Sequence, residues 1–207
     1  METQNPSTDA SATVVGFGDE LLDRMVRAVE LVRERLKRST AALDAAGVPY
    51  AVIGGNAVAA WVSTVDPGAA RNTVDVDLMI NRSDFEAAKA ALETAGFVHY
   101  ELMDVPMFLD GPDGSLRDAV HLLFAEEKVK ESYYASAPRL SVNKSVESYA
   151  LLQLEQLLTM KLTSFRRKDQ VHVQDLIGVG LVDDSWKERL QPELADRLQE
   201  LLDDPEG

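Results

Sequence analysis

Residues 51–80 read AVIGGNAVAAWVSTVDPGAARNTVDVDLMI, and this stretch decides the predicted fold. Apolar runs lie at its two ends, over residues 50–53 and 74–80, and we expect both runs to form strands. Between them, Gly54 and Gly55 form a turn that leads into a short apolar segment, which is expected to be helical. Because side chains alternate between the two faces of a strand, Asp75 and Asp77 in the second run are predicted to share one face.

Two carboxylates side by side repel each other, and a cation between them relieves the repulsion. A hard divalent ion such as Mg²⁺ suits this place, because it takes oxygen ligands and keeps positions for phosphate oxygens. Asp75 and Asp77 at this spacing also fit an ordinary solvated strand edge. The surroundings favour the site: the glycine pair lets backbone N–H groups approach an anion, and Arg71 and Thr73 add a cation and a hydroxyl.

A family resemblance rests on Gly54-Gly55-Asn56-Ala57 followed by Arg71-x-Thr73-x-Asp75-x-Asp77. This pattern resembles the nucleotidyltransferase superfamily with the DNA polymerase β-type palm, and within it the minimal and abortive-infection (AbiEii) type enzymes. The resemblance covers roughly the first two thirds of the chain. It implies an α+β fold, in which a small mixed sheet is flanked by helices and followed by a helical C-terminal part. It also implies Mg²⁺- or Mn²⁺-dependent transfer of a nucleoside monophosphate from a triphosphate to a hydroxyl.

The resemblance also assigns roles to the motif residues. The carboxylates of Asp75 and Asp77 are expected to be catalytic and to bind the metal. The residues expected to bind the nucleotide are Gly54, Gly55, Asn56, Arg71, Thr73 and, from a later segment, Lys168.

A third carboxylate is expected from a later strand in the resembling family, and here the chain departs from the pattern. The run AVHLLFA, residues 119–125, carries His121 at that place. A histidine in an apolar strand is often an ordinary core residue. As a metal ligand, His121 would weaken Mg²⁺ binding or favour Mn²⁺, because imidazole is a poor Mg²⁺ ligand. The alternative function is therefore a catalytically impaired member that binds nucleotide or a partner protein.

A second charged segment follows a dense apolar stripe near residue 160. Lys161 lies within that stripe, so its ammonium either reaches solvent or faces an anion site. The pattern of Lys161, Lys168, Asp169 and Asp175 resembles the segment that lines the nucleotide site in AbiEii-like proteins, and it makes Lys161 and Asp175 the further catalytic candidates. We expect a helix break near residues 168–169, with Asp175 opening the next helix. A charged helix-turn-helix surface is the alternative.

The length of 207 residues fits one domain or one domain with a helical annex. We expect a flexible tail over residues 1–17, the nucleotidyltransferase-like domain with its N-terminal helix over 18–142, and a helical subdomain over 143–207. Ser145 is expected to cap a helix, and the stretch from Trp186 onward is expected to form one closing helix.

The net charge of −14 argues against a protein that coats nucleic acid, since phosphate contacts need clustered Lys and Arg. The chain has no cysteine, which excludes disulfides and thiolate metal sites. It shows no long apolar run and no signal peptide, so a cytoplasmic protein is expected. The acceptor stays open between a tRNA end, a protein and a small molecule. An antitoxin-type protein is a further expected partner.

Overall fold

The computed structural model describes residues 11–102, 105–143 and 148–204, and side chains from residue 18 onward. Within these residues the centre of the molecule is a seven-stranded sheet in the order β3-β4-β5-β2-β1-β7-β6. Its strands are β1 Tyr50–Val52, β2 Val76–Ile80, β3 Val98–Leu102, β4 Val105–Leu109, β5 Val120–Phe124, β6 Val142–Asn143 and β7 Leu151–Leu152. The pairs β2–β5 and β1–β7 are parallel and the others antiparallel, so the sheet is mixed.

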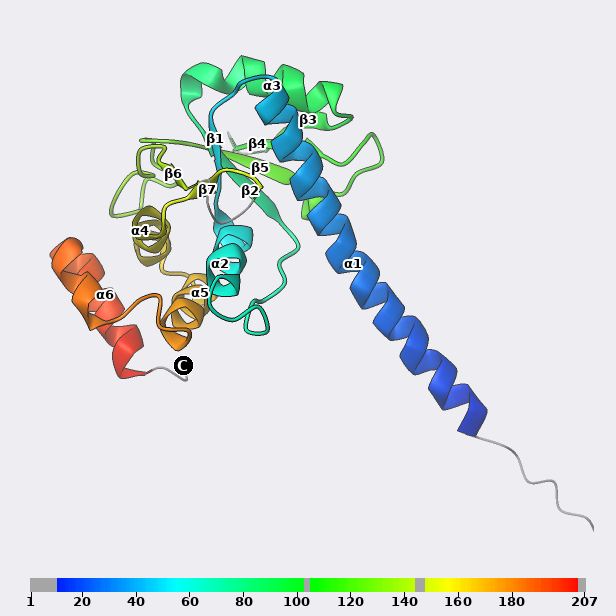
Figure 1. Ribbon diagram of the computed structural model, residues 1–207. Helices are drawn as coiled ribbons and strands as arrows, with labels where there is room; N and C mark the ends of the chain where they lie inside the picture. Colours follow the sequence, from blue (N-terminus) through cyan, green and yellow to red (C-terminus); the bar gives the residue numbers. More distant parts are fainter. Residues whose placement is uncertain (1–10, 103–104, 144–147, 205–207) are drawn as a thin grey trace, which may run out of the picture.

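Helices cover both faces of this sheet (Figure 1). The α-helices are α1 Ser11–Ala45, α2 Gly54–Ser63, α3 Phe85–Thr94, α4 Leu154–Ser164, α5 Arg167–Gly178 and α6 Pro192–Asp203. Short 3-10 helices are η1 Arg82–Asp84, η2 Leu116–Asp118 and η3 Asp184–Arg189. Helices α1 and α3 contact each other, and α1 also contacts β2 and β5; α2, α4, α5 and α6 form a second group. The α+β class predicted from the sequence is confirmed.

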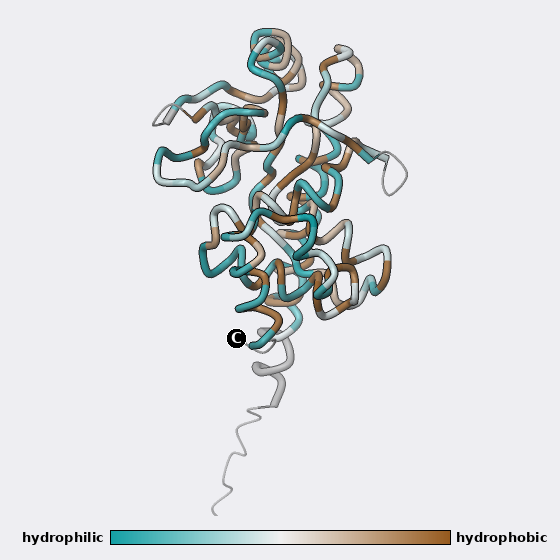
Figure 2. The backbone as a smooth tube through the Cα atoms, turned by 90° about the vertical axis from the view of Figure 1, so that its left-hand side faces the viewer, coloured by the Kyte–Doolittle hydropathy of each residue, from teal (hydrophilic) through white to brown (hydrophobic). Residues whose placement is uncertain are grey.

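Strand β2 occupies the middle of the hydrophobic core. Val76, Leu78, Met79 and Ile80 are fully buried, and only Asp77 in this strand keeps partial exposure. Figure 2 shows brown, hydrophobic stretches of the tube running through the middle of the body. The single polar residue of a buried central strand is thereby held in a fixed position by its neighbours on both sides.

Several boundaries differ from those expected. Helix α1 begins at Ser11, inside the stretch expected as a tail, while residues 1–10 and Ser145 lie outside the described residues. Strands β6 and β7 extend the sheet beyond residue 142. The closing helix expected from Trp186 is instead η3 followed by α6, because Pro192 lacks an N–H and is tolerated in the first turn of a helix but not in its interior.

Candidate active site

The candidate site begins where β1 ends and α2 starts. Gly54 adopts a φ of +68°, and a Cβ built on it would lie 2.0 Å from Oδ2 of Asp77. A Cβ on Gly55 would lie 2.9 Å from Oγ1 of Thr73. Glycine is thus required at both positions because Asp77 and Thr73 approach the backbone closely. At residue 54 the left-handed backbone conformation also favours glycine. The carboxylate of Asp77 lies against the first turn of α2, where the helix dipole is positive.

Asp75 and Asn56 complete this turn. The Asn56 side chain donates a hydrogen bond from Nδ2 to the carbonyl oxygen of Asp75 at 2.7 Å. This bond ties α2 to the chain just before β2, and it occupies the amide group that the resemblance assigned to the nucleotide. Asp75 precedes the first residue of β2, and its side chain is partly buried. The structure thus brings the Asp77 carboxylate, the glycine pair and Thr73 together, and Asn56 holds the backbone of Asp75 next to them.

His121 lies on the neighbouring strand, directly opposite Asp77 in the parallel β2–β5 register. Its Nδ1 is 3.1 Å from Oδ1 of Asp77, and the two side chains are 21% and 25% exposed. The hydrogen bond to Asp77 raises the pKa of His121; burial opposes this shift, and the charges of Asp77 and Asp75 add to it. His121 therefore shares the sheet face of Asp77, as expected for a residue at the third-ligand place.

Asp77 remains ionised despite its surroundings. Burial alone would raise its pKa, but the hydrogen bond and charge of His121 and the charges of Lys161 and Lys168 outweigh burial and lower the pKa. The two lysines come from α4 and α5, more than eighty residues away in the sequence. The fold therefore surrounds a carboxylate at a helix N-terminus with positive charge.

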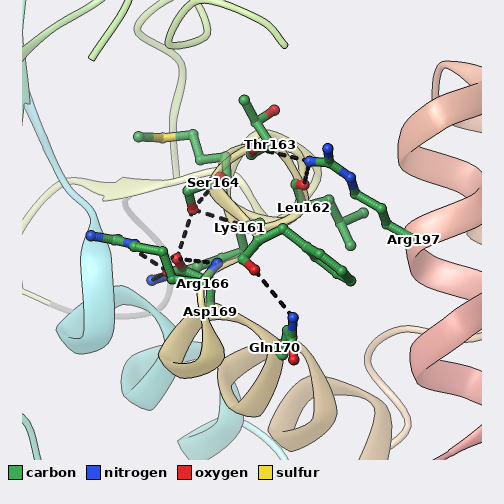
Figure 3. A network of polar contacts seen from close by, with 10 residues as sticks. Lys161, Leu162, Thr163, Ser164, Arg166, Asp169, Gln170 and Arg197 are labelled. Carbon is green, nitrogen blue, oxygen red and sulfur yellow. Dashed lines mark hydrogen bonds and ion pairs between the residues drawn. The ribbon is translucent and has the colours of Figure 1, made fainter. Parts of the chain in front are cut away.

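Lys161 belongs to a buried polar network at the junction of α4 and α5 (Figure 3). Its side chain is 7% exposed, and its Nζ lies 3.2 Å from Oδ1 of Asp169, which is 1% exposed. Asp169 also accepts hydrogen bonds from Ser164 Oγ at 2.8 Å and Arg166 Nε at 2.7 Å. Burial raises the pKa of Asp169, but the Arg166 hydrogen bond and the Lys161 charge bring the pKa down to about 2. Asp169 is thus an ionised anchor for Lys161.

The junction itself corrects the expected helix break. Helix α4 ends at Ser164 and is followed by Phe165, which has a left-handed φ of +46°, and α5 begins at Arg167. Asp169 accepts from the backbone N–H of Arg166 at 3.3 Å, which caps the new helix. Lys168 and Asp175 therefore lie within one helix, and Asp175 does not open it, because the side chain of Asp169 already serves as the start signal.

The last turn of α4 is fixed from two further directions (Figure 3). Arg197 in α6 donates from Nη1 to the carbonyls of Leu162 at 2.7 Å and Thr163 at 3.0 Å. Gln170 donates from Nε2 to the carbonyl of Phe165 at 3.1 Å. Since the last carbonyls of a helix have no partner within it, these bonds hold the turn that carries Lys161.

Arg71 and Asp175 form an ion pair beside the glycine pair. Arg71 Nε lies 2.8 Å and 2.9 Å from the two oxygens of Asp175. Both residues line a small cavity together with Gly55, Thr73 and His172. Asp175 is thus engaged with Arg71, and the structure places this predicted catalytic residue at the Thr73 side of the site, while Lys161 is on the Asp77 side.

A metal ion at this site would depend on the oxygen and nitrogen donors that the described side chains supply. Among residues 11–102, 105–143 and 148–204, no three or more Asp, Glu or His side chains are arranged as a metal-binding cluster. Asp75 and Asp77 still fit Mg²⁺, which commonly takes one or two carboxylates and completes its shell with water and substrate phosphates. Asp169 and Asp175, the two acidic residues of the charged segment after Lys161, are held by Lys161 and Arg71.

No known family model matches this chain, and no curated protein matches it in sequence. Among solved structures, the solution structure of the antibiotic-resistance factor ANT(2'')-Ia is similar, with 17% identity, a TM-score of 0.46, and 84% of this chain and 82% of that chain covered. The crystal structure of ANT(2'')-Ia with adenylyl-2''-tobramycin is similar with 16% identity and a TM-score of 0.48, and the match covers 75% of this chain and 97% of that chain. The crystal structure of a candidate nucleotidyltransferase from H. pylori is similar with 17% identity and a TM-score of 0.47, and the match covers 87% of this chain and 77% of that chain. The described helices include none with the length and apolarity needed to cross a membrane.

Sequence reasoning missed the roles of His172, Ser164 and Arg166. His172 has a buried Nδ1 without a hydrogen-bond partner among the described residues, and burial, with the charge of Lys161, lowers its pKa to about 4. No local signal marks these residues, because their partners come from other helices or across the turn at Phe165. The one available clue was Asp169 three residues after Arg166, a spacing typical of a helix cap.

We expect His172 to make stability depend on pH. Its folded pKa of about 4 lies below its ordinary value of 6.5, so the unfolded chain binds the extra proton first. The free energy of unfolding should fall as pH drops from about 6.5 towards 4, by at most about 1.4 kcal/mol per pH unit from this group. Urea unfolding at several pH values measures the slope, and His172→Gln should flatten it by that amount. An unchanged slope would show that His172 binds its proton over the same pH range in the folded and the unfolded chain.

Proposed function

We propose that this chain is a divalent-metal-dependent nucleotidyltransferase that moves a nucleoside monophosphate from a nucleoside triphosphate to a hydroxyl. One observation carries the proposal: the Asp77 carboxylate lies against Gly54 at the start of α2, with Asp75 two residues earlier and the charges of Lys161 and Lys168 acting on it. Paired carboxylates for a cation, next to backbone N–H groups and lysines for phosphates, are the parts that phosphoryl transfer needs.

In this reaction the acceptor oxygen forms a bond to the α-phosphorus, and the bond from that phosphorus to the bridging oxygen of pyrophosphate breaks. Pyrophosphate leaves with the electron pair, and the acceptor proton passes to solvent or a nearby base. A bound Mg²⁺ would neutralise triphosphate charge and stabilise the attacking and leaving oxygens. Asp75 and Asp77 would hold that ion, and the open backbone at Gly54 and Gly55 would admit the phosphates. Lys161, held by Asp169, would offset charge on the leaving group.

The test is incubation with α-labelled nucleoside triphosphates, Mg²⁺ or Mn²⁺, and separate pools of tRNA, cellular protein and small hydroxyl compounds including aminoglycosides. Label should move to one pool. Asp77→Asn should reduce the transfer at least about 100-fold, because it removes a metal-binding charge. The exposed Asp66→Asn is the matched control and should leave transfer unchanged. A toxin–antitoxin role predicts that expression of the active chain halts growth and that Asp77→Asn relieves the arrest.

The second candidate function is a nucleotide-binding or protein-interaction module without turnover. His121 favours it, because an imidazole 3.1 Å from Asp77 takes the place expected for a third carboxylate. Triphosphate binding in calorimetry together with no label transfer under any metal would select this function. Absence of both binding and transfer would overturn the nucleotide site altogether.

His121→Asp tests the metal position directly. A carboxylate opposite Asp77 adds a negative oxygen ligand, so Mg²⁺ should bind more tightly. We expect roughly a tenfold gain, since changes to residues that merely support metal ligands already alter affinity 10–100-fold. Isothermal titration with Mg²⁺ measures it, and His99→Asp on β3 is a histidine-to-aspartate control. Equal Mg²⁺ affinity of His121→Asp and the native chain would place residue 121 outside the metal shell.

A further inference from the structure

The free half of α1, residues 18–31, leaves the body of the molecule. Figure 1 shows α1 passing the sheet and continuing away from it. The other half is anchored: Arg35 and Arg38 both pair with Asp110, and Leu36 and Leu43 are buried. From residue 18 to residue 31 every side chain is exposed.

The apolar surface of α1 does not stop where the body ends. Its stripe comprises Leu22, Met25, Val29, Val32, Leu36, Ser39 and Leu43, at alternating spacings of three and four. Such a repeat is the seam along which one helix packs on another. The last four positions are buried in the body. The first three continue the same seam in the free half, where Leu22 is 60% and Met25 59% exposed.

Two neighbouring apolar side chains widen this exposed stripe. Leu21 is 45% and Val26 57% exposed, and both flank the stripe. Monomeric proteins rarely leave such contiguous apolar surface uncovered. A helix without tertiary contacts is also marginally stable, since most helical stability in proteins comes from packing of the apolar face. A packing partner is therefore required along the free half.

The charges along the free half identify a second copy of the same chain as that partner. The outer end is acidic, with Asp19, Glu20 and Asp23. The inner part is basic on balance, with Arg24 and Arg27 against Glu30, and Arg33 follows just beyond it. Asp19 and Arg33 lie seven residues before and after Val26, so all three flank the seam at the same heptad position. In an antiparallel pair centred on Val26, each Asp19 faces Arg33 of the second copy. In a parallel pair, Arg33 would instead face Ala28 of the second copy and would lose this acidic partner.

We propose that two copies of this chain pair antiparallel through the free halves of α1, about a two-fold axis near Val26. Self-complementary surfaces of this kind are typical of two-fold dimers. Helix α1 contacts β2, β5 and α3, whereas Asp77 lies against α2, so the candidate site of each copy stays open in the dimer.

Sedimentation velocity of the full chain over a range of concentrations tests the pairing. The native chain should reach twice the monomer mass. Met25→Glu buries two charges at the seam and should weaken the dimer at least 100-fold. Ala41→Glu adds the same charge at an exposed position away from the seam and should leave it intact. Because Met25 lies outside the body and is exposed in the monomer, thermal unfolding followed by circular dichroism should show the same melting temperature of the body for both variants. A monomer at every concentration, or a dimer indifferent to Met25→Glu, overturns the proposal.

Charge exchange tests the orientation. Asp19→Arg and Arg33→Asp should each weaken the dimer about tenfold, because each creates two like-charge contacts, and the double variant should restore the native affinity. Failure of this rescue overturns the antiparallel arrangement. A monomeric native chain that binds anionic lipid vesicles through Met25 would assign the seam to a membrane surface and likewise overturn the dimer.

Discussion

Gly54→Ala is expected to damage both stability and transfer. The added methyl would lie 2.0 Å from Oδ2 and 2.8 Å from Cγ of Asp77, so the carboxylate or the first turn of α2 must move. The left-handed φ of +68° adds strain for any residue with a Cβ. We expect the free energy of unfolding to fall by about 2–5 kcal/mol. Transfer should fall at least about 100-fold, since displacements near 1 Å have such effects.

Gly47→Ala separates the effect of the close contact with Asp77 from the effect of the left-handed backbone conformation. Gly47 has nearly the same φ, +66°, but a Cβ there meets nothing within 4 Å among the described residues. The free energy of unfolding of Gly47→Ala should fall only by the cost of the left-handed conformation, about 1–2 kcal/mol, and the variant should keep full transfer activity. Denaturant unfolding and the labelled-nucleotide assay measure both variants. Equal stability losses with unchanged transfer in Gly54→Ala would contradict the placement of Asp77 against α2.

Asp169→Asn is expected to cost about 3–5 kcal/mol of unfolding free energy. The variant keeps the shape of the side chain but leaves the buried Lys161 ammonium without its counter-ion. Burial already lowers the pKa of Lys161, and the charge of Asp169 is the main influence opposing that shift. The pKa of Lys161 should therefore fall further in the variant, and the loss of charge near Asp77 should also weaken triphosphate binding.

Lys161→Met changes the other partner of this buried ion pair. It removes the cation, whereas Asp169 keeps its hydrogen bonds from Ser164 and Arg166. The double variant Asp169→Asn/Lys161→Met should therefore recover part of the stability lost by Asp169→Asn alone. The surface pair of Lys187 with the exposed Asp184 supplies a control, since Asp184→Asn should cost less than about 1 kcal/mol. A small effect of Asp169→Asn in urea unfolding would mean that Lys161 is already neutral in the native protein.

The strand that carries Asp77 and the glycine turn beside it could be predicted from the sequence, because the signals for both are local. A period of two placed Asp77 on the opposite face from its apolar neighbours, and the glycine pair marked the turn it approaches. The strand containing Asp77 was predicted to begin at Val74, but β2 begins at Val76. The difference arises because Asn56 binds the carbonyl of Asp75, so the backbone before Val76 is tied to α2 and not to a neighbouring strand.

The charged C-terminal part was harder to predict. Lys161 was recognised as an unusual lysine in an apolar stripe, but its partner Asp169 depends on a turn at Phe165, a residue type that seldom takes a left-handed conformation. The pairing of Arg71 with Asp175 joins residues more than a hundred positions apart. Neither contact has a period or spacing that a single sequence displays, so the roles of these residues stay predictions.

The short strand β7 has a consequence for any attempt to divide the chain near residue 142. It pairs with β1 in parallel, with Val52 opposite Leu151, and Trp61 donates from Nε1 to the carbonyl of Leu152 at 3.0 Å. A fragment ending before β7 would leave β1 as a bare sheet edge lined by buried aliphatic residues, a template for intermolecular strand pairing. Such a fragment is expected to aggregate during expression, and the native sheet can be completed only after the ribosome has released most of the chain.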